Sequence, residues 1–176
     1  MAEQKIIAKA DIQNLWDFSE NVDQSKIDAA ILRAQQTDLE SLLGAAMYHD
    51  FVEDYNGLTF DTPAYQTLYD GGEYTYKAQT IYFRGVKALL SVYAYIHLVD
   101  IIRINVVRSG QVYKVAEESE FLEDFQSRAD NRKAKSDAIR LEKDVLQYLE
   151  TNLSTYPLFR YREYKDVKTS YNFYKL

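Results

Sequence analysis

The stretch from Val86 to Val107 is apolar around nearly the whole circumference of a helix, and it restricts the possible folds more than any other feature. A helix of this kind is surrounded by other helices or crosses a membrane. Four polar residues interrupt it: Lys87, His97, Asp100 and Arg103. The uncharged run from Ala88 to Val99 is shorter than the about 20 apolar residues that span a bilayer. We therefore expect a buried central helix beginning at Gly85, and no membrane contact.

Apolar residues at helical spacing, together with capping and helix-breaking residues, predict that the rest of the chain is also mainly helical. Thr62-Pro63 starts one helix, because a capping hydroxyl precedes a proline at the first helical position. Residues 73–84, rich in tyrosine, are expected to form an aromatic loop with some extended structure. Ser109-Gly110, between β-branched pairs, favours a hairpin. The expected helices cover residues 9–18, 24–43, 45–55, 63–69, 85–105 and 117–152.

The predicted fold class is all-α, a bundle of about five helices that includes one long C-terminal helix. A short extended or hairpin excursion is expected near residues 106–115. The long helix would reach about 50 Å, more than a domain of this size needs. Residues 128–137 within it are almost wholly polar, so the helix bends there or crosses solvent or a neighbouring subunit. We expect a helical domain over residues 1–155 and an extended arm over residues 156–176, after Pro157 stops the last helix.

The residue types that carry catalysis are scarce in this chain. It has no cysteine and two histidines, and Gly71-Gly72 precedes an aromatic segment instead of a phosphate-binding helix. His49 shares a helix face with Glu53, which is too few ligands for a metal site. His97 lies near Asp100 and Arg103, an arrangement typical of an internal ion network or a subunit contact. We therefore predict no catalytic residues, no metal and no cofactor, and expect a protein that is not an enzyme.

Tyrosine is abundant, with 16 in the chain, and it is a residue suited to protein interfaces. From residue 156 onward the charge is +3, so the remainder of the chain, with a total of −6, carries −9. This basic, aromatic arm either folds back on its own domain or orders on a neighbour by strand addition or aromatic anchoring. It could also stack on single-stranded nucleic acid, which the acidic body disfavours.

The candidate interface residues fall into two groups. Those expected to bind a partner protein or a neighbouring subunit through the arm are Tyr156, Phe159, Arg160, Tyr161, Arg162, Tyr164, Lys165, Tyr171, Phe173 and Tyr174. Those expected at contacts between subunits are Tyr74, Tyr76, Tyr82, Phe83, Arg128, Arg132 and Lys133.

Several short segments resemble the head–tail connector proteins of phages, also called adaptor or head-completion proteins. In the first half these are ADIQNLWDFSENVD, KIDAAILRAQQTDLESLLG and AAMYHDFVEDY. Further along they are Gly71–Thr75, Gly85–Tyr95 and the Tyr156-Pro157-Leu158 segment. The resemblance is closest to connector-like proteins of Bacteroidetes phages, including the crAss-like phages. It covers most of the chain.

The resemblance implies a structural virion protein at the head–tail interface, assembled in the host cytoplasm. Copies of the chain would form a ring, typically dodecameric, that docks on the portal protein and extends the DNA channel. Duplex DNA would pass through without specific binding, and further neck or tail proteins would dock below. The alternative from the residues alone is a nucleic-acid-binding packaging or regulatory module, with Arg160, Arg162, Lys165 and Lys168 contacting phosphates.

Overall fold

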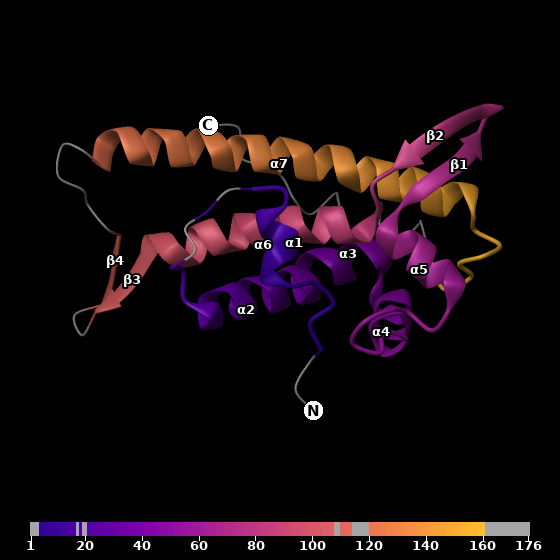
Figure 1. Cartoon of the computed structure of the whole chain (residues 1–176), viewed down its shortest axis with the longest axis horizontal. Coiled ribbons are helices and arrows are strands. Elements are labelled where there is room, and N and C mark those ends of the chain that lie inside the picture. Colours follow the sequence, from indigo (N-terminus) through magenta and orange to yellow (C-terminus); the bar gives the residue numbers. More distant parts are fainter. Residues whose placement is uncertain (1–3, 17, 19–20, 108–109, 114–119, 161–176) are drawn as a thin grey trace.

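The computed structural model describes residues 4–16, 18, 21–107, 110–113 and 120–160, with the backbone alone for residues 103–107, 110–113 and 120–130. Figure 1 shows an elongated molecule in which the longest helix runs along one side. The elements in chain order are α1 (Lys9–Gln13), α2 (Gln24–Arg33), η1 (Ala34–Leu39), α3 (Glu40–Leu43), α4 (Ala45–Glu53), α5 (Pro63–Asp70), β1 (Gly72–Tyr76), β2 (Gln79–Phe83), α6 (Gly85–Arg103), β3 (Ile104–Val107), β4 (Gly110–Tyr113) and α7 (Glu120–Thr151).

Helix α6 is the centre of the fold. It packs against α7, α2, α5, α1 and η1, and Figure 1 shows it between α7 and α2. Val86, Leu89, Leu90 and Ala94 are fully buried along it. By length and composition the segment Gly85–Ile102 could also cross a membrane, but half of it is buried inside the protein. The apolar circumference is therefore explained by helices packed on several sides.

The long N-terminal helix expected over residues 24–43 departs from α geometry at its middle. The segment η1 is a π-helix between α2 and α3, and π-helical turns of this kind insert an extra residue into an α-helix. Gln35 within it is fully buried. Its amide oxygen accepts a hydrogen bond from the Ile6 backbone at 3.0 Å, and its amide nitrogen donates to the Gln4 carbonyl at 3.0 Å. The π turn thus ties the N-terminal segment to the helix.

The all-α prediction is wrong, because the chain is about 64% helix and 10% strand. The main difference concerns residues 72–83, expected as an aromatic loop with some extended structure, which form the antiparallel hairpin of β1 and β2. The two turn residues, Lys77 (φ 49°) and Ala78 (φ 63°), both have a left-handed backbone. Tight hairpin turns of this type usually carry Asn-Gly or similar pairs, so Lys-Ala gives little sequence signal.

The second hairpin, of β3 and β4, lies where an excursion was expected and connects α6 to α7. Helix α7 runs without interruption from Glu120 to Thr151, close to the predicted bounds. Its buried stripe faces α6 and consists of Ala134, Ala138, Leu141, Val145 and Leu149. The spacing of these residues, three or four apart, is that of one helix face.

Candidate protein-interaction surface

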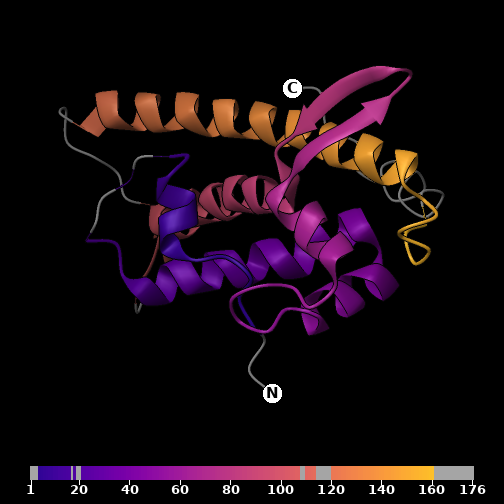
Figure 2. The ribbon, with the colours of Figure 1, turned by 45° about the vertical axis from the view of Figure 1, so that its right-hand side comes forward.

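The β1–β2 hairpin projects from the body past α7, as Figures 1 and 2 show. Its register pairs Gly72 with Phe83, Tyr74 with Ile81 and Tyr76 with Gln79 on one face. The other face carries the cross-strand pairs Glu73–Tyr82 and Thr75–Thr80. Because side chains alternate along a strand, one face can anchor the hairpin while the other meets solvent.

The anchoring face is held by an aromatic cluster on the C-terminal half of α7. The ring of Phe83, 1% exposed, stacks on Tyr148 with a centroid distance of 4.0 Å and an interplanar angle of 15°. Tyr74 meets the edges of both rings, at 5.8 Å from Phe83 and 5.3 Å from Tyr148. Burial raises the pKa of the Tyr74 hydroxyl. Phe83 and Tyr74, predicted as subunit contacts, therefore fasten the hairpin to its own domain.

Among the residues that the structure describes, the outer face of the hairpin is exposed and the outer edges of both strands are unpaired. Tyr82 is 65% exposed, and Glu73, Thr75 and Thr80 around it are exposed as well. Within the part of the chain that the structure describes, no third strand pairs with the outer edge of β1 or β2. Tyr76 lies nearer the tip, half-buried, with the Lys77 ammonium 5.1 Å from its ring centroid. Open edges beside an exposed tyrosine are suited to pairing with a strand from another chain.

The first residues of the predicted arm belong to the chain's own core. Tyr156 is 2% exposed and Phe159 is 5% exposed. The Tyr156 hydroxyl donates to the Ala64 carbonyl at 2.8 Å and lies 3.2 Å from the Tyr148 hydroxyl. Burial raises the pKa of Tyr156 above its usual value. At residues 156–160 the chain folds back on its domain, so these two rings are not presented to a partner.

Of the other predicted contact residues, some lie among the described residues and the rest lie outside them. Arg132, Lys133 and Arg160 are exposed, and Arg160 interacts with another group of the chain. The Lys133 ammonium lies 5.5 Å from the Trp16 ring centroid. The side chain of Arg128 lies outside the described residues. So do Tyr161, Arg162, Tyr164, Lys165, Tyr171, Phe173 and Tyr174.

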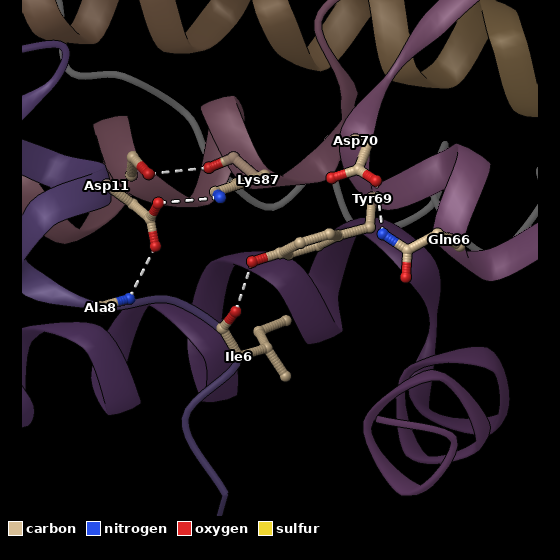
Figure 3. A network of polar contacts seen from close by, with 8 residues as sticks. Ile6, Ala8, Asp11, Gln66, Tyr69, Asp70 and Lys87 are labelled. Atoms are coloured by element: carbon tan, nitrogen blue, oxygen red, sulfur yellow. Dashed lines mark hydrogen bonds and ion pairs between the residues drawn. The ribbon is translucent and has the colours of Figure 1, made fainter. Parts of the chain in front are cut away.

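A polar network joins the N-terminal segment to α5 and α6, as Figure 3 shows. The Tyr69 hydroxyl donates to the Ile6 carbonyl at 2.6 Å, and the Asp11 carboxylate pairs with the Lys87 ammonium at 2.9 Å. The same carboxylate accepts a hydrogen bond from the Ala8 backbone at 2.9 Å. Burial raises the pKa of Tyr69. A cavity of about 420 Å³ borders this network, but its central charges are paired with one another, which indicates a structural role.

Neither histidine lies in a cluster of possible metal ligands among the described residues. His97 lies 2.6 Å from the carboxylate of Asp38 in η1, not in the expected network with Asp100, which is exposed. His49 is exposed and contacts the ring of Tyr48 at 5.4 Å. In the described part of the chain no three His, Cys, Asp or Glu side chains are grouped to hold a metal. That the protein is not an enzyme stays a prediction.

The geometry thus defines a mainly helical, elongated domain from which an aromatic β-hairpin projects. The chain belongs to the family of unknown function DUF6712, whose pattern matches residues 39–169. The matched region includes the projecting hairpin, α6 and α7. No curated protein and no solved structure matches the chain.

Proposed function

We propose that the protein is a structural virion protein, a head–tail connector subunit that forms a ring on the portal. In that position it extends the DNA channel and offers a platform for neck or tail proteins. The segments quoted above that resemble phage connectors support this assignment. The observation that carries it is the β1–β2 hairpin, which is anchored on one face and, within the described part of the chain, exposed on the other face and unpaired at both edges.

The hairpin suits repeated contacts between identical subunits. A two-stranded hairpin is only marginally stable by itself, and its outer edges gain hydrogen bonds when a neighbouring chain adds a strand. Tyr82 and Tyr76 supply aromatic area beside those edges. The net charge of −6 also suits a ring through which duplex DNA slides, because an acidic protein adheres weakly to phosphates.

The test is to produce the full-length chain together with the portal protein from the same genome. Co-purification and ring-shaped particles on the portal in negative-stain images are the expected result. A chain that stays monomeric and does not co-purify with portal would overturn the proposal. Binding of DNA in place of portal, with a steep dependence on salt, would favour the nucleic-acid-binding alternative.

The contribution of the hairpin is tested by Tyr82→Ala, with Leu58→Ala as the matched control. Both side chains are large and exposed, Tyr82 at 65% and Leu58 at 87%, so neither change should alter folding stability by more than about 0.5 kcal/mol. Tyr82→Ala should reduce the yield of rings, whereas Leu58→Ala should leave it unchanged. Equal yields from the two variants would remove the hairpin from the proposal.

A further inference from the structure

An open groove of about 350 Å³ lies where the segment after α1 meets α6 and α7. Its apolar floor is formed by Val92, Tyr95 and Leu141. Trp16 forms one wall and stacks on Tyr95 with a centroid distance of 4.7 Å and an interplanar angle of 13°. Leu15 beside it is 41% exposed. Val92 and Leu141 are each 2% exposed and Tyr95 is 8% exposed, so the accessible apolar surface of the groove comes mainly from Leu15 and the half-buried Trp16.

The rim of the groove is positively charged, in contrast to the acidic chain. Arg84, Lys133 and Arg140 line it, and all three are exposed. Among the described residues Arg84 makes no ion pair, and the Lys133 ammonium lies 5.5 Å from the Trp16 ring centroid. Arg140 contacts Asp137 at 3.4 Å, and Asp137 is the single acidic side chain among the described residues of the lining. The groove therefore favours a ligand that is both acidic and apolar.

One segment of this chain has that chemistry. Residues 116–126, with the sequence AEESEFLEDFQ, contain five acidic and no basic side chains. They also contain three large apolar residues, Phe121, Leu122 and Phe125. Carboxylates would meet the cationic rim while the phenylalanine and leucine side chains pack against Trp16 and Leu15, as in an amphipathic segment bound in a groove.

The segment cannot fill the groove of its own molecule. Helix α7 is continuous from Glu120 to Thr151, and the groove is lined by residues 133–141 of the same helix. At 1.5 Å per residue, Leu122 lies about 22 Å along the helix axis from Asp137. The occupant must therefore come from a second copy.

We propose that the groove beside Trp16 binds the acidic segment 116–126 of a neighbouring copy of this chain. The groove and the segment are different surfaces, so the contact is heterologous, and repeated head-to-tail contacts close into a ring when the rotation allows it. The inference rests on the self-association in the proposed function and names the partner surfaces that would produce it.

The single tryptophan of the chain makes the groove directly observable, since Trp16 forms its wall. The experiment titrates a synthetic peptide of residues 116–126, which has no tryptophan, into the full-length protein and follows tryptophan emission. The expected result is a saturable change in emission, with a binding affinity that falls as salt is added. A control peptide with its five acidic residues replaced by their amides should bind at least about tenfold more weakly, since it lacks the charges that the rim attracts.

Two variants of exposed arginines locate the binding site. Arg84→Glu should weaken peptide binding about tenfold, because it reverses one of three rim charges. Arg132→Glu is the matched control on α7, as Arg132 is exposed but does not line the groove. Equal affinity in both variants, no emission change, or a response to a DNA duplex and not to the peptide would each overturn the inference.

The same variants separate this inference from the connector proposal. If the double variant Arg84→Glu/Arg140→Glu still forms rings on portal as the unaltered chain does, the groove is not the ring contact and the connector function stands. If the peptide binds at the groove but the chain never assembles with portal, the groove is supported and the connector function fails.

Discussion

Tyr156 provides the sharpest test of the structural role given to the start of the arm. Its ring lies 6.2 Å from that of Tyr65 and 5.9 Å from that of Tyr148, and its side chain is 2% exposed. A buried aromatic side chain removes about 150–250 Å² from water, and large-to-alanine changes at such sites cost about 3–5 kcal/mol. We expect Tyr156→Ala to lower the free energy of unfolding by that amount. The total is about 5–15 kcal/mol for a domain of this kind.

Tyr156→Phe separates packing from hydrogen bonding. The phenylalanine keeps the ring but leaves the Ala64 carbonyl without its 2.8 Å donor, which should cost about 1–2 kcal/mol. The difference between the two variants measures the packing of the ring. In thermal unfolding, Tyr156→Ala should lower the Tm by about 6–20 °C, because each kcal/mol corresponds to about 2–4 °C at this chain length.

Urea unfolding followed by far-ultraviolet circular dichroism measures these differences. Leu158→Ala is the control on the same segment, since Leu158 is 40% exposed and its removal should change stability by no more than about 0.5 kcal/mol. A Tyr156→Ala variant as stable as Leu158→Ala would refute the view that residues 156–160 are part of the domain. The reasoning also means that a truncation meant to remove only the arm should end after residue 160, not after residue 155.

Three further changes test other parts of the fold. The double variant Lys77→Asn/Ala78→Gly in the hairpin turn should raise the free energy of unfolding by about 1 kcal/mol, because Asn-Gly adopts the left-handed turn without strain. An unchanged midpoint of urea unfolding would contradict this. Gly71→Ala should lower the free energy of unfolding by at least about 2 kcal/mol, because the φ of Gly71 is +82° and an added Cβ would lie 2.4 Å from a backbone carbonyl oxygen of β2. Each kcal/mol corresponds to about 2–4 °C in Tm, so a Tm within about 2 °C of the unaltered chain would count against this close approach. Burial raises the pKa of Tyr69 and Tyr93 above the usual value of about 10, so the free energy of unfolding should fall as pH rises beyond about 10, where these tyrosines ionise more readily in the unfolded chain. Titration of all tyrosines at about pH 10 with the ellipticity unchanged would oppose this.

The elements predicted well are those set by short-range patterns. The central helix begins at Gly85 as expected, α5 begins at Pro63, and α7 lies within three residues of its expected bounds. For the hairpin β1–β2 only a loop with some extended structure was predicted, since Lys77 and Ala78 adopt a turn that neither residue favours. The π-helix was missed, because the residues of η1 also fit an ordinary α-helix.

Sequence patterns could not predict contacts between residues that are far apart in the chain. The histidine at position 97 was expected to meet charges one turn away on its own helix, and it pairs with Asp38, 59 positions earlier. In the same way the tyrosine content predicted interfaces but not which rings would be exposed. Phe83 and Tyr156 complete the chain's own core around Tyr148, whereas Tyr82 remains outside.

The sequence by itself determined a mainly helical chain built around one apolar helix, because helix periodicity, caps and breakers act over a few neighbouring residues. Only the tertiary structure decided which face of each element is covered. That choice depends on the packing of segments far apart in the chain, and it separates the aromatic residues that hold this domain together from those left exposed.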